Sequence, residues 1–494
     1  MNMKLSRSID ENIKAFKEQM NDCADIKMID MHLGKDSKIH CFIAYIEVTL
    51  DNTAFEKNAI GRMVNAVHSV SEEEIAKYLD ENAMGISDVA YMTTIEDAIL
   101  GMLTGDAIMF FDGYDKALKI SDKGYPGMSV QESDSEKVIR GSNESFNESV
   151  KVNTALIRKR IRTSKLKVQE LKKGVRSNTN INVVYIEGIA YPHIVQEIKR
   201  RIEKYEIDGV MDSGVIEQLA EKKWYSPFPQ FQTTRRPDMA AMAILEGRIV
   251  VLSDNSPIAL ILPTNVNSFL KTTDDYYNRF EVATFARLIR YVAAFLSLSL
   301  PGLYLAVTNF HTQILPTSLL LSFWQNRMGV PFPEVVEVLL MELSFELLRE
   351  AGIRLPGAMG NTIGIVGGLI IGQAAVDANL VSPIVVIIVA FTALCSFAIP
   401  SEEFAFSFRI LKFFIIVMSA WLGYFGFLMG LFIILIHLSR LKSFGIPYLM
   451  PFVGADLSDY QDERDSVIRA PFRKITKRPI YAKRNQRTKL KKKE

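Results

Sequence analysis

Hydrophobic and polar positions are distributed differently in the two halves of this 494-residue chain. Up to about residue 280, charged residues and turn formers interrupt short apolar runs, as in a globular protein. From Phe285 to His437, long apolar blocks carry few charges, and after Asp462 the chain is strongly basic. The pattern predicts an α/β soluble N-terminal half, an α-helical transmembrane domain and a basic cytoplasmic tail at 455–494.

Four apolar stretches are long enough to cross a membrane, because a spanning helix needs about 20 mostly apolar residues. They occupy residues 285–307, 358–376, 383–400 and 413–436. We therefore expect a helical membrane domain at 285–440, with about four spans and one or two amphipathic helices.

A further stretch, 333–352, is mostly apolar but has glutamates four residues apart at Glu342, Glu346 and Glu350. This spacing predicts one acidic stripe along a helix. Three interpretations stay open: an interfacial amphipathic helix with a solvated edge, a bundle helix whose carboxylates face a water-filled cavity, or a helix in a soluble loop. The second would mark a path for ions, as ionisable residues inside membranes usually do.

The stretch 358–376 carries glycine at every fourth position, although glycine weakens a helix interior by about 1 kcal/mol relative to alanine. These glycines are Gly360, Gly364, Gly368 and Gly372. Small residues on one ridge let neighbouring membrane helices approach closely. We therefore predict that this ridge packs against another helix.

The opposite side of the same helix is a candidate pore lining. It consists of Thr362, Val366, Leu369 and Gln373, with Asp377 near the same side at the exit. In a ring of such helices, this order of polar and apolar residues would form wet vestibules separated by a hydrophobic constriction, which can close by dewetting. The pore is expected along this helix, with the acidic helix or another segment as alternatives.

The soluble half contains an internal duplication. Segments 39–48 and 181–189 are both rich in strand-forming residues and contain Tyr-Ile-Glu. Segments 103–118 and 245–260 both run from a glycine through an apolar strand and an aspartate turn to a second strand. We predict two similar α/β subdomains, 1–125 and 176–275, each with helices on a small mixed sheet.

Residues 126–175 are expected to form a linker and a basic helix between these subdomains. The segment 121–149 is dense in Ser, Gly, Asn and Glu, which is typical of a linker. Residues 150–173 are predicted to form one basic helix. Its charged face is either solvated or bound to an acidic partner or to lipid headgroups.

Composition and motifs argue against several classes of function. The net charge of +2 describes no single region and gives no support for nucleic-acid binding. The three cysteines are isolated, no two of the six histidines share a metal-ligand spacing, and no HExxH, GxSxG, P-loop or GxGxxG motif occurs. Asp112 and Asp254 lie in similar turns, but hairpins favour aspartate for backbone reasons. We expect no enzyme, no metal and no cofactor.

The basic tail predicts the orientation of the membrane domain. Residues 474–494 contain ten Lys or Arg and one acidic residue. Short basic segments stay on the cytoplasmic side of a membrane. Because the N-terminal half lacks a secretory signal pattern, both ends are expected inside, with an even number of spans.

Ordered motifs from about Lys38 to Pro479 resemble one family, the A subunits of bacterial spore germinant receptors (the GerA family). They include "NTALIRKR" (153–160), "YSPFPQFQTTRRPD" (225–238) and "GIVGGLIIGQAAVDANLVSP" (364–383). The motif positions taken as family residues are Arg140, Gly141, Pro227, Pro229, Arg236, Pro237 and Asp238. Two positions depart from the family pattern: Ser142 replaces a proline and Arg235 a glutamate. The first would loosen the joint between subdomains, and the second makes a salt bridge there doubtful.

The resemblance implies a multi-pass protein of the inner spore membrane with its N-terminal domain and C-terminal tail in the cytoplasm. Such subunits are expected to form a homo-oligomeric ring that conducts ions when a nutrient is sensed. The implied partners are a transporter-like B subunit and a lipoprotein C subunit. The alternatives are a paralogous ion-release channel that is not directly nutrient-linked, a secondary transporter and a membrane-anchored scaffold.

Overall fold

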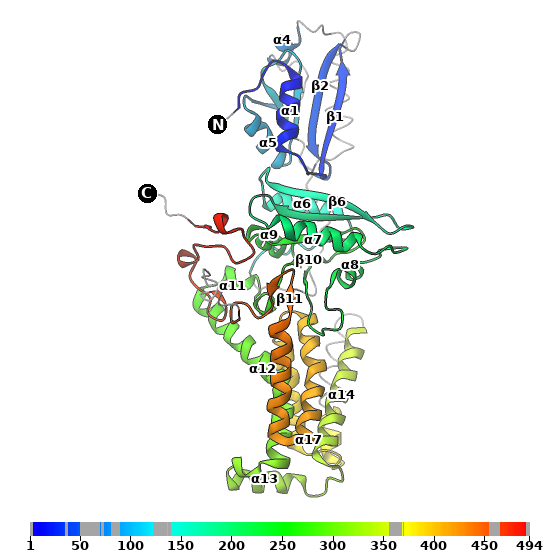
Figure 1. The fold of residues 1–494 in the computed structure, drawn as a ribbon, viewed down its shortest axis with the longest axis vertical. Helices are drawn as coiled ribbons and strands as arrows, with labels where there is room; N and C mark the ends of the chain where they lie inside the picture. The colour runs from blue at the N-terminus through cyan, green and yellow to red at the C-terminus, as the bar shows by residue number, and fades with distance from the viewer. Residues whose placement is uncertain are drawn as a thin grey trace. The chain divides into compact units, whose positions relative to one another are not determined.

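The computed structural model describes residues 3–34, 38–49, 70, 74–80, 89–121, 136, 140–354, 368, 370–453 and 465–490. The chain divides into two compact units, each with its own layers (Figure 1). The α/β unit comprises Met1–Trp224, Phe231–Pro263 and Phe472–Glu494. The helical unit comprises Tyr225–Gln230 and Thr264–Pro471.

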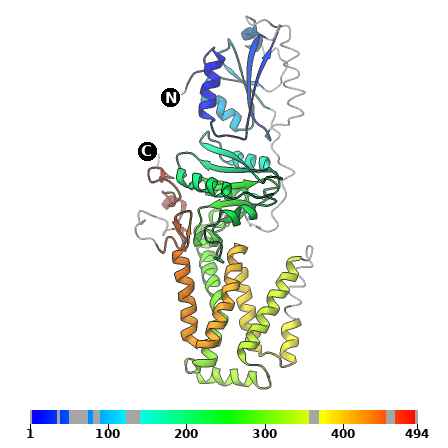
Figure 2. The same ribbon diagram turned by 45° about the vertical axis from the view of Figure 1, so that its right-hand side comes forward.

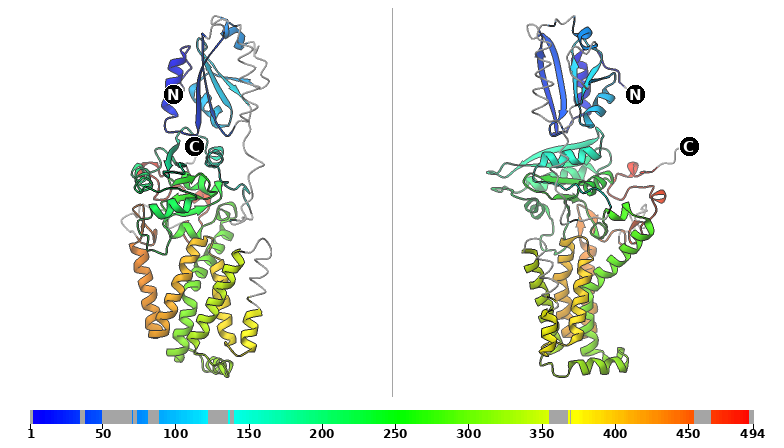
Figure 3. Two further views of the ribbon diagram at one scale, coloured as in Figure 1. Left: turned by 90° about the vertical axis from the view of Figure 1, so that its right-hand side faces the viewer. Right: turned by 180° about the vertical axis from the view of Figure 1, so that it is seen from behind.

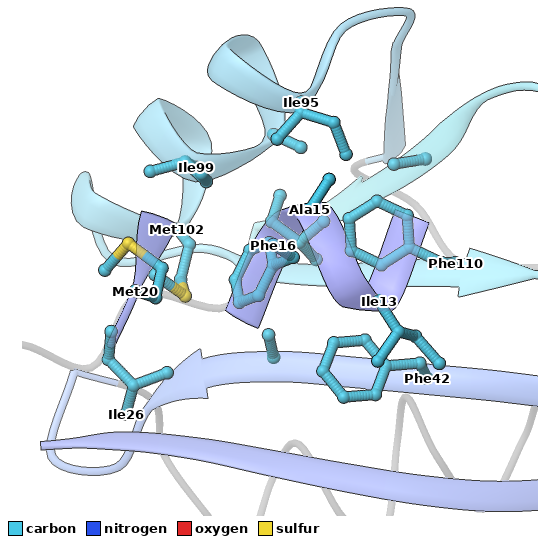
Figure 4. Packing of buried hydrophobic residues seen from close by; sticks show 14 of the residues in the cluster. Ile13, Ala15, Phe16, Met20, Ile26, Phe42, Ile95, Ile99, Met102 and Phe110 are labelled. Carbon is cyan, nitrogen blue, oxygen red and sulfur yellow. The ribbon is translucent and has the colours of Figure 1, made fainter. Parts of the chain in front are cut away.

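The first subdomain of the α/β unit is a five-stranded antiparallel sheet in the order β1-β2-β4-β5-β3. Its strands are β1 (Ile26–Leu33), β2 (Ile39–Ile46), β3 (Val89–Met92), β4 (Ala107–Phe111) and β5 (Ala117–Ile120). Its helices are α1 (Ile9–Gln19), α4 (Ile75–Asp80) and α5 (Ile95–Leu103). Helices α1 and α5 cover one face, where Phe16 of α1 packs against Phe42 and Phe110 of the sheet (Figure 4). Ile75 and Leu79 of α4 belong to the apolar cluster on the other face.

The second subdomain repeats this arrangement with the strand order β6-β7-β9-β10-β8. Its strands are β6 (Leu166–Lys173), β7 (Thr179–Ile186), β8 (Gln232–Thr234), β9 (Ile249–Ser253) and β10 (Ala259–Leu262). Its helices are α6 (Val150–Arg160), α7 (Pro192–Glu203), α8 (Ser213–Ala220) and α9 (Pro237–Leu245). Each strand thus takes the place in the second sheet that its counterpart has in the first. The predicted duplication is confirmed in strand order. The expectation of mixed sheets is wrong, because all strand pairs described in both sheets are antiparallel.

The duplication extends to individual hydrogen bonds. The carboxylate of Asp112 accepts from the backbone N–H of Ile9 at the start of α1, and that of Asp254 accepts from Val150 at the start of α6, both at 3.1 Å. A carboxylate there satisfies an N–H that the helix itself leaves unpaired and complements the helix dipole. The two similar turns found in the sequence therefore hold a helix onto each sheet.

The prediction of one basic helix at 150–173 is wrong. Helix α6 ends at Arg160, and residues 166–173 form strand β6, which pairs with β7 along its whole length. Leu166 and Val168 are fully buried, two residues apart, because alternate side chains of a strand face the core. The expected boundary between residues 175 and 176 therefore separates two paired strands, and α6 and β6 belong to the second subdomain.

The basic side chains of α6 have partners within the chain. Lys159 and Arg160 both pair with Glu144, at 2.6 and 2.5 Å. Arg158 is fully buried, and its guanidinium binds both carboxylate oxygens of Asp25 at 2.8 and 2.9 Å. This helix is therefore neither a bare solvated face nor a free basic surface for lipid headgroups.

The C-terminal tail packs against the second subdomain. It contains the short 3-10 helices η6 (Phe472–Lys474) and η7 (Arg484–Gln486). Ala482 is fully buried and pairs with Ala190, and the N–H of Lys483 donates to the carbonyl of Ile189 at 2.9 Å. Gly247 has a positive φ, and a Cβ there would lie 2.8 Å from the Cα of Ala482. The backbone of the tail thus needs a glycine opposite it.

The helical unit contains long apolar helices joined by short segments. Its elements are α10 (Val266–Leu270), α11 (Asp274–Tyr277), α12 (Phe280–Phe310), η3 (Thr312–Ile314), α13 (Thr317–Arg327), α14 (Glu334–Arg354), α16 (Pro383–Phe397), α17 (Glu402–Arg440), β11 (Lys442–Ser443) and β12 (Ile446–Pro447). Residues 370–377 are also helical. Among the described residues, α12 and α17 are the helices that are long and apolar enough to cross a membrane.

Helix α17 is not one straight helix. Gly423 has a non-helical backbone with φ 60° and ψ −139°, and the arms on either side lie next to each other (Figures 2 and 3). A Cβ on Gly430 would lie 2.7 Å from Cδ1 of Ile415, although a continuous helix would separate these residues by about 22 Å. The predicted single span at 413–436 is therefore wrong, because Gly423 turns it into a hairpin.

Candidate functional site

The segment Tyr225–Gln230 is part of the helical unit, although α/β-unit residues flank it in the sequence. Its centre, Phe228, is fully buried and packs against Phe404 and Phe408 with ring centroids 5.9 Å apart in both pairs. The same ring stacks on His437 at 6.1 Å. Because Phe404 and His437 lie in different arms of α17, one side chain contacts both arms of the hairpin.

Side chains of the helical unit also hold the backbone of this segment. The carbonyl of Pro227 accepts a hydrogen bond from Ser407 at 2.5 Å, and that of Pro229 accepts one from Tyr448 at 2.8 Å. Proline has no N–H and a fixed φ, so an extended Pro-x-Pro segment presents carbonyl groups as its backbone partners. The predicted motif residues Pro227 and Pro229 therefore belong to a rigid connection to α17. We call Tyr225–Gln230 the connector.

A second cluster lies between α14 and α17 and consists of charged side chains. Glu342 is 1% exposed and pairs with Lys412, which is 4% exposed. Glu346 lies 3.3 Å from Arg409 and 3.7 Å from Lys412. The acidic stripe expected on 333–352 therefore meets a basic stripe on the first arm of α17.

The stripe changes character along the helix. Glu350 is more than half exposed and pairs with Arg354 of the same helix at 2.6 Å, which makes it an ordinary surface residue. Glu342 is buried, so removing its partner would leave a charge in an apolar interior at a cost of about 3–5 kcal/mol. The interpretation of 333–352 as an amphipathic helix with one solvated edge therefore fits Glu350 but not the buried Glu342.

The predicted pore residues lie mostly outside the described residues. This applies to Thr362, Val366 and Leu369 and to the packing glycines Gly360 and Gly364. Gln373 and Asp377 are exposed. Their role as pore lining stays a prediction.

The remaining glycines of that stretch approach other helices. A Cβ at Gly368 would lie 3.7 Å from the ring of Phe345 in α14. At Gly372 it would lie 3.3 Å from Cγ1 of Val386 in α16, which is tighter than an ordinary contact. The role of these glycines as one packing ridge stays a prediction.

A third cluster joins the start of α12 to residues before and after the helices. Arg287 is fully buried and pairs with Asp275 at 2.9 Å and with Asp465 at 2.8 Å. Burial would raise the pKa of Asp465, but Lys271 and Arg287 outweigh it and hold that pKa below its usual value. No local sequence pattern indicates this cluster, because Asp465 lies 178 residues after Arg287 in the chain.

The family-motif residues of the α/β unit form a buried network. Arg236 binds Asp238 at 2.8 Å and donates to the carbonyl of Ser142 at 2.9 Å. A salt bridge between Arg236 and Asp238 is therefore present beside Arg235. The effect of the charge change at Arg235 itself stays a prediction. Ser142 also accepts a hydrogen bond from Arg160 of α6 at 3.1 Å. The looser joint between subdomains expected from its replacement of proline stays a prediction.

The other motif positions have backbone roles. Pro237 begins α9, where its missing N–H costs no hydrogen bond. Gly141 has φ 143°, which a residue with a side chain rarely adopts. Arg140, directly before Gly141, lies on the surface. Among the described residues, no group of His, Cys, Asp and Glu side chains could hold a metal ion.

Comparisons with known proteins give the family. The family described as Bacillus/Clostridium GerA spore germination protein matches residues 14–481. Spore germination protein KA of Bacillus subtilis is 38% identical over 475 residues, which cover 96% of this chain and 87% of that protein. Spore germination protein B1 of the same organism is 36% identical over 480 residues, covering 97% and 98%.

Two further similarities involve a membrane protein and a solved structure. The uncharacterized membrane protein YfkQ of Bacillus subtilis is 38% identical over 483 residues, which cover 97% of this chain and 93% of that protein. The N-terminal domain of the A subunit of the Bacillus megaterium spore germinant receptor GerK3 is 27% identical, covering 53% of this chain and 97% of that one, with a TM-score of 0.42. With a family match across nearly its whole length, the chain belongs to the GerA family of spore germination proteins.

Proposed function

We propose that this protein is the A subunit of a spore germinant receptor and that it forms a membrane ring which conducts ions when a nutrient is sensed. The GerA family and the apolar helices α12 and α17 support a membrane subunit. The B and C subunits are its proposed partners, and the inner spore membrane its proposed location.

The observation that carries the channel proposal is the ion pair between Glu342 and Lys412. Buried charges inside apolar helices are costly and usually mark a path for ions. In a ring of subunits, the carboxylates of α14 would form rings of negative charge, as cation-selective pores use. In the structure described here Lys412 compensates Glu342, so this arrangement corresponds to a closed path.

The connector supplies a route from the α/β unit to this pair. Phe228 contacts both arms of α17, and Lys412 lies on the first arm. A movement of the connector would shift α17 relative to α14 and separate Lys412 from Glu342. Uncompensated carboxylates would then attract water and cations.

The packing of the tail supports the proposed orientation. Residues 472–490 contact the second subdomain, so the tail and this subdomain lie on the same side of any membrane that the helical unit crosses. The basic composition of the tail favours the cytoplasmic side.

Single-channel recordings of the purified protein in planar bilayers test this function. We expect steps of cation-selective current, with selectivity reduced by Glu342→Gln and by Glu346→Gln, which remove charge but keep size. Glu350→Gln is the matched control, because Glu350 is exposed and should not affect selectivity. Carrier-like flux without steps would favour a transporter, and silence would favour a scaffold.

The constriction predicted on the glycine-rich helix needs its own test. Val366→Ala or Leu369→Ala should leave the constriction leaky, so that spores germinate without nutrient. If both variants assemble normally and remain dormant and nutrient-responsive, this helix only packs. The acidic helix would then be the remaining pore candidate.

A further inference from the structure

Helix α13 is a short helix that the helical unit leaves largely uncovered. None of its residues, Thr317 to Arg327, is buried. Its contacts come from one side: Phe323 packs against the ring of Tyr304 at 6.4 Å, and Arg327 pairs with Glu334 and Glu337 of α14 at 2.5 and 3.3 Å.

The rest of α13 divides into an apolar flank and a polar edge. Leu321 and Trp324 lie three residues apart and therefore on one face of the helix, and they are 56% and 71% exposed. The polar edge consists of Ser318, Ser322, Gln325 and Asn326. An exposed tryptophan beside polar side chains is typical of a boundary between water and an apolar medium.

The surroundings of α13 show the aromatic side chains of a membrane interface. Gly423, at the turn of α17, lies against Phe310 at the end of α12: a Cβ there would be 2.7 Å from the ring. Trp421 beside this turn is 76% exposed, and Tyr424 packs on His311 at 5.9 Å. Tryptophan and tyrosine are enriched where membrane proteins cross the headgroup region.

The two ends of the helical unit differ in the number of positively charged residues. Between His311 and Pro333 the only charged residue is Arg327. The opposite end carries Arg287, Arg290, Arg440 and Lys442. Because positive residues accumulate on the cytoplasmic side of membranes, the end that holds α13 is the outer one.

We propose that α13 lies in the headgroup region of the outer leaflet, with Trp324 and Leu321 among the upper acyl chains and the polar edge toward water. This binding surface for lipid rests on the proposed membrane function. A lipid surface fits better than a protein partner, because aromatic side chains are also exposed at the end of α12 and at the turn of α17: Phe310 is 50% and Trp421 76% exposed. Binding of α13 to lipid would fix the depth of α12 and α14 in the bilayer.

Tryptophan fluorescence in lipid nanodiscs tests the proposal with the full-length protein. The chain has three tryptophans, so Trp224→Phe with Trp421→Phe leaves Trp324 alone, and Trp224→Phe with Trp324→Phe leaves Trp421 alone. Lipids brominated near the headgroup should quench Trp324 at least twofold more than lipids brominated near the bilayer centre. Aqueous acrylamide should quench it less than in the unfolded protein.

A matched pair of substitutions on α13 sharpens the result. Leu321→Gln, on the apolar flank, should reduce quenching of Trp324 by the shallow bromines about twofold or more, whereas Ser322→Gln, on the polar edge, should leave it unchanged. If both variants behave alike, the flank does not face lipid and the proposal is overturned.

The two single-tryptophan proteins separate the possible failures. If lipid quenches Trp421 but only acrylamide quenches Trp324, α13 projects into water and the proposal is wrong. If neither quencher reaches Trp324, a second copy or a partner protein covers the flank, which also overturns it. If lipid quenches neither tryptophan, the placement of the helical unit in a membrane fails, and with it the proposed function.

Discussion

Both units of the molecule contain buried ion pairs, and two of them, Arg158 with Asp25 and Lys412 with Glu342, are built differently. In the α/β unit, Arg158 donates two hydrogen bonds to Asp25 and another to the carbonyl of Leu166 at 3.0 Å. In the helical unit, Lys412 binds one oxygen of Glu342. The other oxygen, Oε1, is buried without a hydrogen-bond partner among the described residues.

The number of hydrogen bonds indicates different roles for the two pairs. The Arg158 pair fixes a joint, whereas the carboxylate of Glu342 can exchange Lys412 for another partner. The Arg158 pair accompanies backbone pairing between the first subdomain and β6, where Val168 donates to Asp22 at 2.9 Å and accepts from Ala24 at 3.0 Å. Breaking it would disrupt several bonds at once. The Glu342 pair has an unused acceptor, and buried acceptors gain free energy when water or an ion reaches them. Such a pair suits a gate better than a joint.

The largest effect is expected from Arg158→Met. It leaves the carboxylate of Asp25 buried without a partner, which costs about 3–5 kcal/mol. Hydrogen exchange of the full-length protein in detergent should show the free energy of opening of the β6 amides lowered by this amount. Lys151→Met is the control, because its pair with Glu47 is partly exposed and should contribute less than about 1 kcal/mol. Equal small effects of both would contradict a structural role for Arg158.

Lys412→Met should have the next largest effect, seen in function. The loss of the ammonium leaves Glu342 uncompensated and should destabilise the closed arrangement by about 3 kcal/mol, so spores should germinate without nutrient. Lys412→Arg keeps the charge and should stay dormant. The double variant with Glu342→Gln removes both charges and should restore dormancy. Dormant spores of the single variant would contradict the gate.

A smaller effect is expected from Phe228→Leu in the connector. Leucine keeps an apolar side chain but loses the ring contacts with Phe404 and Phe408, each worth about 0.5–1.5 kcal/mol. The receptor should assemble normally, while the rate of nutrient-induced germination falls several-fold. Phe425→Leu, on an exposed side chain of α17, should leave the rate unchanged. Equal rates in both variants would show that the connector does not carry the signal.

The smallest effect concerns acid stability near Asp465. Its folded-state pKa lies below the unfolded value, which is about 3.9 for aspartate, so its stabilisation is complete above that value. It is lost as the pH falls through the lower folded-state pKa. Below about pH 4, the unfolding free energy of Asp465→Asn should therefore fall less steeply with acid than that of the wild type. Parallel curves in urea titrations would exclude this contribution.

Much of the architecture could be predicted from local patterns. Paired strand motifs indicated the three central strands of each sheet, because short apolar runs bounded by turn residues are typical of strands buried on both faces. The aspartate turns were noticed, but their capping role was not, since Ile9 and Val150 lie 103 and 104 residues away in the chain. The helix prediction at 150–173 failed because the many Lys and Arg residues obscured the alternation that begins at Leu166.

In the candidate sites too, contacts between residues far apart in the chain could not be predicted from the sequence. Glu342 was recognised from its spacing, but Lys412, its partner 70 residues later, was not. The connector was recognised only as a family motif, because nothing near Phe228 in the sequence indicates that it packs between the arms of α17. The turn at Gly423 was missed because glycine is common in membrane helices and does not by itself reverse a chain.

The sequence by itself determined the apolar and charged segments, the duplicated strands and the family, because these depend on composition, periodicity and local motifs. Only the tertiary structure decided which charges are compensated, where α17 folds back and what holds Phe228. Those features depend on contacts between residues far apart in the chain, such as Ile415 with Gly430 and Glu342 with Lys412. Burial in a packed interior, which no local pattern records, sets their free energies.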